Sequence, residues 1–394
     1  MPQKWAAMKK TLLFLPGPVP VAQPVLEAMA WPMINHRGPE FADLLARMER
    51  GMQPIFGTER DVLFLGSSGT GGLETAVANC FSPGDSLLSV PVGVFGKRLA
   101  DIARTYGCNV EVLETPLGAA VDAKALRERL ARDAGRTIKG ILLTQNETST
   151  GVQNNMRELA AAIRDHGALT IVDAVSGLGA SPFEMDDWGY DVVVSASQKA
   201  IAVPPGIAMV AVSDRAWQAI ERATIPRFYF DLRKAREFAR KGQTAWTPPI
   251  SIFYALAVAL ERFHADGLEA NYARHARYAS AIRAAFEALG FTIFSRSDAH
   301  SVTVVAATPP SGVECAALLK TLRENYGVVL SGGQGELTGK IVRMGTMGDV
   351  SEADLVGAIG AIELALADRG VAVTFGSGTG AAGTVLNGRV AATV

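Results

Sequence analysis

Short apolar runs alternate with longer amphipathic segments from about residue 60 to residue 200. The apolar runs lie in DVLFLGSS, DSLLSVPVG, NVEVLET, KGILLTQNE, LTIVDAVS and DVVVSAS, and each run predicts a strand. Helical periodicity follows the first four of them, for example in GGLETAVANCF and MRELAAAIRDHG. Continuous apolar strands that alternate with helices are typical of a mainly parallel sheet with helices on both faces. The pattern therefore predicts an α/β fold.

The pattern changes near residue 267, where a long helix precedes two short strands, a helix, a strand and a last helix. This order predicts a smaller C-terminal α+β domain. We expect four parts along the chain: an N-terminal arm over residues 1–19, a large domain over 20–266, a small domain over 267–370 and a Gly/Ala-rich tail over 371–394. The composition of the tail indicates a flexible segment.

The tail also contains Gly378, Gly380 and Gly383 in GxGxxG spacing. A dinucleotide-binding fold needs a βαβ unit around this motif and an acidic residue about twenty positions further on. Only eleven residues follow Gly383, and none of them is acidic. We therefore expect no dinucleotide site in the tail.

Composition and charge narrow the class of protein. The chain has 394 residues, of which 48% are hydrophobic and 20% charged, and its net charge of −1 gives no footprint for nucleic acid. The apolar stretch TLLFL near the N-terminus is too short for a signal peptide, and no run reaches membrane-spanning length. Three scattered cysteines indicate neither a disulfide framework nor a zinc site. We expect a cytoplasmic protein without metal, membrane or nucleic-acid partner.

Four polar residues fall where predicted strands end: Ser68, Thr148, Asp173 and Lys199. In open α/β sheets, ligands bind beyond the carboxyl ends of the strands. Lys199 lies in SASQKAIAVPPG among small and polar residues. It is either a surface loop lysine or a lysine held at the end of a buried strand, for chemistry that needs an uncharged amine.

The other strand ends also allow two interpretations each. The loop GSSGTGGLE, residues 66–74, suits a phosphate because glycines, hydroxyls and helix amides can surround it, but a plain strand–helix turn fits as well. It lacks the Lys-Ser/Thr of a P-loop, which disfavours a nucleotide. Asp173 is either a buried carboxylate that needs a cationic partner or a cap for the segment that follows.

Together these residues describe one ligand. Pyridoxal 5′-phosphate is bound through three groups. Its phosphate would lie on the loop from Ser68 to Thr70, its protonated ring nitrogen on Asp173 and its aldehyde on Lys199. The link to the lysine makes the cofactor electrophilic, and Asp173 keeps the ring protonated so that it can accept carbanion charge. The combination predicts a site for this cofactor.

The sequence resembles the class V aminotransferases of the alanine–glyoxylate and serine–pyruvate type. The resemblance runs to about residue 366 and rests on LPGPVP, SSGTGGLETAVANCFSPGD, GVFGKR, NETSTGVQ, VDAVSGLGA, SQKAIAVPPG, TPPISIFYAL and GKIVRMG. It implies the fold-type I architecture of pyridoxal-phosphate enzymes, with a mainly parallel seven-stranded sheet and a smaller C-terminal α+β domain. It also implies a homodimer.

The resemblance assigns further roles by position. It implies that the cofactor ring lies between Phe95 and Val175 and that the hydroxyl of Thr148 faces the ring's phenolic oxygen. It implies phosphate contacts from one group of residues: Ser68, Gly69, Thr70 and Gln198. Thr244 and Thr247 match residues that the neighbouring subunit lends to the phosphate, and Arg343 matches the clamp for the substrate α-carboxylate.

We therefore expect a ping-pong aminotransferase that works through a Lys199 aldimine. Its donor would be alanine or serine, and its acceptor a 2-oxo acid such as glyoxylate or pyruvate. An aspartate or aminoethylphosphonate donor is the alternative, in which Arg37 or Arg227 would bind the distal anion unless both are simply solvated. Departures such as TQNE, where relatives often have Thr-His-Gly-Glu, bear on substrate preference and remove no required group.

Two rivals have different chemistry. A cysteine desulfurase or other lyase needs a mobile loop cysteine, whereas Cys315 lies in a predicted helix and the loop SGGQGE has none. A silent cofactor-binding or regulatory protein is disfavoured because Lys199 and Arg343 are both present and no DNA-binding appendage is seen.

Overall fold

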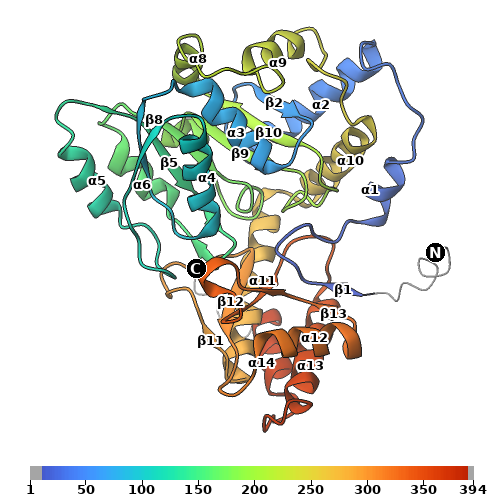
Figure 1. Cartoon of the computed structure of the whole chain (residues 1–394). Coiled ribbons are helices and arrows are strands. Elements are labelled where there is room, and N and C mark those ends of the chain that lie inside the picture. The colour runs from blue at the N-terminus through green and yellow to red at the C-terminus, as the bar shows by residue number, and fades with distance from the viewer. Residues whose placement is uncertain (1–10, 389–394) are drawn as a thin grey trace.

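A computed structural model describes residues 11–388 and centres on a seven-stranded sheet in the order β2-β10-β9-β8-β5-β3-β4 (Figure 1). Its strands are β2 (Val62–Leu65), β3 (Ser86–Ser89), β4 (Asn109–Val112), β5 (Ile138–Thr144), β8 (Leu169–Asp173), β9 (Val192–Ala196) and β10 (Ala208–Val212). Neighbours from β9 to β4 pair in parallel, whereas β10 is antiparallel to both β9 and β2. The predicted mainly parallel sheet is confirmed, and β10 is a strand that the sequence analysis missed.

Helices cover both faces of this sheet because successive strand residues point to opposite sides. In β10, Met209 and Ala211 belong to one buried cluster, and Ala208 and Val210 belong to another. The first cluster includes residues of α1 (Gln23–Ala28), α2 (Pro39–Phe56), α5 (Ala123–Ala131), α6 (Met156–Ile163), α7 (Met185–Trp188) and α10 (Ile250–Asp266). The second includes residues of α3 (Gly69–Cys80), α4 (Val94–Thr105), α8 (Asp214–Ile220) and α9 (Leu232–Ala239).

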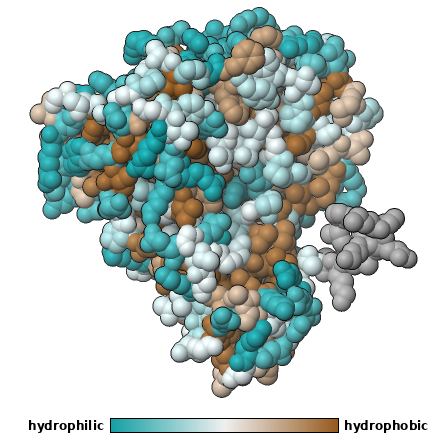
Figure 2. Space-filling view, in the orientation of Figure 1, coloured by the Kyte–Doolittle hydropathy of each residue, from teal (hydrophilic) through white to brown (hydrophobic). Residues whose placement is uncertain are grey.

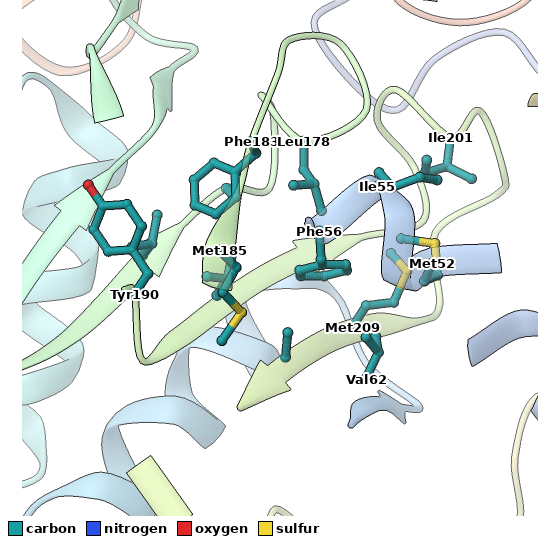
Figure 3. Close-up of a cluster of buried hydrophobic side chains, with 14 of the residues drawn as sticks. Met52, Ile55, Phe56, Val62, Leu178, Phe183, Met185, Tyr190, Ile201 and Met209 are labelled. Carbon is teal, nitrogen blue, oxygen red and sulfur yellow. The ribbon is translucent and has the colours of Figure 1, made fainter. Parts of the chain in front are cut away.

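Figure 3 shows part of the first cluster, where side chains of α2 lie against side chains of the sheet and of the loop after β8: Met52, Ile55, Phe56, Val62, Leu178 and Met209. Burial of apolar area at about 25 cal/mol per Å² stabilises this packing. The two-sided core holds the strands rigidly, so the residues that follow each strand have fixed positions.

The C-terminal part has its own sheet and its own core. The four-stranded antiparallel sheet has the order β11-β12-β15-β14. Its elements are α11 (Leu268–Ala288), β11 (Thr292–Ile293), β12 (Val304–Thr308), α12 (Cys315–Tyr326), β14 (Ser331–Gly332), a 3-10 turn (Gly335–Leu337), β15 (Val342–Gly345) and α13 (Glu352–Ala367). The predicted α+β arrangement is confirmed. The predicted boundary after residue 266 lies at Gly267, between α10 and α11, and stays a prediction.

The predicted N-terminal arm is tied to this smaller part rather than free. β1 (Leu12–Leu13) pairs in parallel with β13 (Val328–Val329), and Phe14 is buried in the C-terminal core. Figure 1 shows the arm passing from β1 towards α1 of the larger part. Residues 1–10 of the predicted arm lie outside the described residues.

The expectation of a flexible tail is wrong for residues 377–386, which form a helix, and residues 389–394 of the predicted tail lie outside the described residues. Helix α14 (Ser377–Leu386) packs on α11, and Ala382 and Val385 lie in the C-terminal core. The buried carboxylate of Glu363 accepts N–H bonds at the start of α14, from Gly376 at 2.8 Å and Gly378 at 2.9 Å. Small residues let this helix approach closely, so a composition typical of linkers forms a packed helix here. All three glycines of the GxGxxG spacing lie within this helix.

Hydrophilic residues cover much of the face in Figure 2, with hydrophobic residues in small groups between them. Within residues 11–388, no helix combines the length and the apolar character that a membrane span requires. Two short strands, β6 (Asn146–Glu147) and β7 (Val152–Gln153), follow β5 as a hairpin and lie next to the site described below.

Candidate active site

The strand ends meet in one cavity, as predicted. Residues from five segments line it: Ser68, Gly69, Thr70, Phe95, Thr148, Asp173, Val175, Gln198 and Lys199. These are nine of the predicted site residues. Parallel strands end at the same edge of the sheet, which explains why segments more than a hundred positions apart converge there.

The loop from Ser68 to Thr70 forms the first turn of α3. Ser68 precedes the helix in an extended conformation, and its side chain does not cap the helix amides. A Cβ at position 69 would lie 2.7 Å from Cγ2 of Val175, so only glycine allows this close approach. The start of α3 therefore offers amides and hydroxyls to an anion in the cavity.

Asp173 ends β8 and is only 5% exposed. Burial is the main cause that raises the pKa of its carboxyl to about 7, and the charge of Glu147 adds to the rise. The Val175 N–H, Lys199 and Arg98 act in the opposite direction. Oδ1 accepts the Val175 N–H at 3.0 Å, so Asp173 also supports the turn that follows, as the alternative interpretation held. A cation in the cavity would be stabilised by this carboxylate.

Asp173 predicts a pH dependence for the cofactor-free protein. Its folded pKa lies above the ordinary value of about 3.9, so the folded state binds the proton more tightly than the unfolded state does. The free energy of unfolding should therefore fall as pH rises from about 4 to about 7. Asp173→Asn should flatten this slope in urea unfolding at several pH values, whereas Asp165→Asn, at an exposed position, should keep it. Equal slopes in both variants would contradict the assignment.

Lys199 follows β9 and is partly buried, which is not the environment of a surface loop lysine. Burial lowers the pKa of its amine to about 8, and the nearby guanidiniums of Arg343 and Arg98 lower it further, against the attraction of Asp173. Nζ donates a hydrogen bond to the carbonyl oxygen of Pro16 at 2.8 Å. The predicted bias towards a neutral amine is confirmed in direction.

Glu147 supports the cavity wall without lining it, and the sequence analysis missed this role. It is fully buried, and its Oε2 accepts the N–H groups of Phe95 and Gly96, each at 3.0 Å. Its Oε1 accepts the hydroxyl of Ser149 at 2.6 Å. The carboxylate thus holds the first turn of α4, where a negative charge is favourable, and fixes the Phe95 ring at the cavity wall.

Glu147→Gln should therefore destabilise the protein. An amide group would place donors against backbone donors, and an unsatisfied buried group costs about 1–3 kcal/mol. Urea unfolding should show a loss of that size. The control is Glu336→Gln, because Glu336 makes an exposed ion pair with Lys97. A Glu147→Gln variant as stable as the control would contradict this role.

A hydroxyl network orients Thr148. Its Oγ1 donates to Ser176 Oγ at 2.9 Å, and Ser176 Oγ in turn donates to the carbonyl oxygen of Asn146 at 2.8 Å. The Asn146 side chain also bonds to Thr303, at 2.9 Å, from the C-terminal part. Asn146 and Ser176 line the cavity, and the sequence analysis missed both.

Arg343, on β15 of the C-terminal sheet, is not one of the residues that line the cavity, but it contacts Thr148, which is. It is 4% exposed, its Nε donates to the Gly332 carbonyl at 2.8 Å, and its Nη1 donates to the Thr148 carbonyl at 2.9 Å. Burial is the main cause that lowers its pKa, and Glu147 opposes this effect. Two carbonyls hold the guanidinium plane, which leaves donors for a carboxylate next to Thr148.

Of the two arginines considered for a distal anion, Arg37 is exposed, as the solvated alternative held, whereas Arg227 differs from expectation. Arg227 is neither solvated nor available for a distal anion, because its guanidinium donates to backbone carbonyls including Ala78, Ala223 and Ile220. Arg37 bonds to Gln243 at 2.6 Å, outside the cavity. Arg98, which the sequence analysis did not single out, lines the cavity with its guanidinium carbon 4.7 Å from the Phe95 ring centre.

Thr244 and Thr247 do not lie in the Lys199 cavity of their own chain. They line a separate cavity with Tyr229 and Trp246, and Thr244 Oγ1 donates to the Trp246 carbonyl at 2.7 Å. Their expected role towards a neighbouring subunit stays a prediction. Cys315 is buried at the start of α12, and burial raises its pKa, which disfavours a sulfur-accepting role.

Comparisons with known proteins agree with this chemistry. The family model described as Aminotransferase class-V matches residues 25–346. The chain is 39% identical to "Soluble hydrogenase, small subunit" of Synechococcus sp., over 96% of this chain and 99% of that one. It is 37% identical to an L-aspartate–glyoxylate aminotransferase of Paracoccus denitrificans, over 94% of both chains.

A serine–glyoxylate aminotransferase of Methylorubrum extorquens is 35% identical to this chain over 95% of each. Among solved structures, pyridoxamine–pyruvate aminotransferase of Mesorhizobium loti has a TM-score of 0.91 and 28% identity, over 97% of this chain and 98% of that chain. The similarity therefore spans both parts of the fold, including the strand that carries Arg343.

Proposed function

The chain belongs to the aminotransferase class-V family and is a pyridoxal-phosphate-dependent aminotransferase of an amino acid and a 2-oxo acid, and we propose that its donor is alanine or serine. The acceptor we propose is glyoxylate or pyruvate. The observation that carries this proposal is that Arg343 is the buried arginine beside the cavity, whereas Arg37 and Arg227 are engaged elsewhere. The short side chains of alanine and serine carry no second anion, so these donors need no second arginine.

The residues of the cavity fit the cofactor. The first turn of α3 suits the phosphate, the carboxylate of Asp173 suits a protonated ring nitrogen, and Phe95 and Val175 offer surfaces for a flat ring. The missing Cβ at Gly69 leaves room where the backbone must approach a ligand. When bound, pyridoxal phosphate supplies an electrophilic carbon and a ring that accepts carbanion charge.

The chain's own residues would then do three things. Arg343 binds and orients the substrate α-carboxylate through its free N–H groups. Lys199, with its pKa lowered to about 8, is neutral often enough near neutral pH to take the proton from the substrate Cα and return it later. Asp173 holds a proton at the ring nitrogen by its negative charge.

A matrix of amino acids against glyoxylate, pyruvate and 2-oxoglutarate tests the donor directly. Alanine or serine with glyoxylate or pyruvate should give the highest kcat/KM, against a reaction without enzyme. No turnover with any pair would instead support a silent cofactor-binding protein.

Aspartate, or an aminoethylphosphonate, is the second candidate donor, and Arg98 is the observation that favours it. This exposed guanidinium lines the cavity, and no carboxylate of residues 11–388 forms an ion pair with it. The Paracoccus denitrificans relative also carries aspartate in its name. The ratio of kcat/KM for alanine or serine to kcat/KM for aspartate, with glyoxylate as acceptor, distinguishes the two candidate donors. A ratio well below one that Arg98→Gln reverses would replace our first choice.

We also propose a homodimer. Thr244 and Thr247 lie apart from the Lys199 cavity of their own chain, as expected if they complete the site of a second copy. Phe228 and Tyr229, large exposed aromatic residues near Trp246, suit a buried interface. Light scattering should give a dimer or a multiple of it, and phosphate binding should weaken on dilution. A fully active monomer would contradict the role of both threonines.

The cytoplasmic location remains part of the proposal. Its support is that Cys80, Cys108 and Cys315 are all free and buried, which suits a reducing compartment.

A further inference from the structure

The amine of Lys199 has a backbone partner from the far end of the chain. Its Nζ donates to the carbonyl oxygen of Pro16 at 2.8 Å. The next residue, Gly17, lies directly beside the lysine side chain. A Cβ at position 17 would lie 2.6 Å from Nζ, 2.7 Å from Cδ and 2.8 Å from Cε. Real Cβ atoms do not approach so closely, so a Cβ at position 17 would force the Lys199 side chain to move from its position.

The backbone at position 17 requires glycine for a second reason. Its φ of +126° lies in a region that side chains with L configuration rarely adopt. Two independent constraints therefore favour glycine at the point where the arm crosses the lysine.

The arm that carries Pro16 is hydrogen-bonded to β13 and to β15 of the C-terminal part. The Phe14 N–H donates to the Val329 carbonyl at 3.0 Å, and the Phe14 carbonyl accepts the Gly345 N–H at 2.8 Å. Gly345 is the last residue of β15, the strand that carries Arg343. The Pro16 carbonyl, which accepts from Lys199, is therefore connected to the same strand that carries the Arg343 guanidinium.

We propose that the Pro16 carbonyl is a positioning group for the amine of Lys199, and that Gly17 is the positioning residue that leaves room for it. The proposal rests on the proposed role of Lys199 as the base. A neutral amine has two N–H groups and one lone pair. When one N–H is held by Pro16, the lone pair is directed away from the arm and is available for a proton in the cavity.

The arm thereby links the lysine to the substrate clamp. Pro16 and Gly17 contact Lys199, whereas the Gly332 and Thr148 carbonyls hold Arg343. Position 17 should consequently affect the rate of proton transfer more than the affinity for the donor.

A double-mutant cycle in the cofactor-free protein tests the contact. The proteins are the natural chain, Gly17→Ala, Lys199→Ala and the double variant, each unfolded in urea. The backbone penalty of alanine at position 17 is present in both backgrounds, but the clash exists only where Lys199 is present. We expect Gly17→Ala to lower the folding equilibrium constant at least about fivefold more with Lys199 than without it. Equal effects in both backgrounds would overturn the proposal.

A kinetic measurement separates positioning from packing. Gly17→Ala should lower kcat at least tenfold and leave the donor KM within about twofold, with a larger isotope effect from a Cα-deuterated donor. Gly84→Ala is the matched control, because Gly84 has a φ of +88° and open space around it. Its kcat should match that of the natural chain. An unchanged kcat and isotope effect in Gly17→Ala would overturn the proposal.

Pro16→Ala keeps the carbonyl but loosens the backbone that carries it, and it adds no atoms, so it serves if Gly17→Ala fails to fold. We expect a several-fold loss of kcat at constant KM, and no loss would overturn the proposal. The proposed function is tested separately. If Lys199→Ala kept its turnover, the base assignment would fail, whereas the urea cycle would still report whether position 17 and Lys199 are coupled.

Discussion

Lys199→Ala should lose turnover by a factor on the order of 10³ or more, which is the largest effect expected in this protein. In the proposed function, Lys199 provides both the covalent attachment of the cofactor and the amine that moves the proton, and the variant removes both. It keeps the first turn of α3 and Asp173, so it should still bind pyridoxal phosphate noncovalently.

Borohydride reduction and peptide mapping check the assignment independently of activity. The natural chain should carry a stable phosphopyridoxyl label on Lys199, and Lys199→Ala should carry none. Lys124→Ala is the control, because Lys124 is a highly exposed lysine of α5 and should leave both label and turnover unchanged. A label on another lysine, or turnover of Lys199→Ala near that of the natural chain, would contradict the assignment.

The sequence was sufficient to predict the strand-end residues because their signal is local. Asp173 and Lys199 each follow an uninterrupted apolar strand, and parallel strands bring such ends together. The same signal was present for β10, whose apolar run resembles the runs of β8 and β9, so that strand was predictable in principle. The antiparallel direction of β10 could not be predicted, because it depends on the turn after Lys199.

Residues that act over long sequence distances could not be predicted in this way. Glu147 holds the start of α4 across about fifty positions, and Pro16 meets Lys199 across 183. No periodicity in either segment indicates these contacts, and Glu147 lies three residues beyond the end of β5. Helix α14 was missed because a glycine-rich segment has low intrinsic helix propensity, and packing on α11 outweighs that preference.

The location of Arg343 connects the two parts of the fold. The large sheet supplies the proposed cofactor site, whereas the C-terminal sheet supplies the guanidinium, which donates to the Thr148 carbonyl at 2.9 Å. The catalytic cavity is therefore complete only when both parts are folded and docked. For this reason, a loss of substrate binding without a loss of cofactor binding would identify the contribution of the C-terminal part.

Arg343→Gln should show that separation. Breaking a buried charged pair costs about 3–5 kcal/mol, which corresponds to a loss of kcat/KM for the donor on the order of 10² to 10⁴. Arg343→Lys keeps the charge, but one ammonium cannot pair with both carboxylate oxygens. It should therefore raise the donor KM by a factor on the order of ten or more.

The ranking of donor kcat/KM among the natural chain, Arg343→Lys and Arg343→Gln tests how the carboxylate is bound. A carboxylate that binds through a planar fork predicts natural chain, then lysine, then glutamine in donor kcat/KM, with the cofactor spectrum unchanged in all three. Arg323→Gln, which alters an exposed arginine of α12, is the control and should behave as the natural chain. Urea unfolding must accompany the kinetics, because the Gly332 and Thr148 carbonyls each lose a donor in Arg343→Gln. If Arg343→Gln stays folded and binds the donor as the natural chain does, the α-carboxylate is held by another group, and Arg98 becomes the first residue to test.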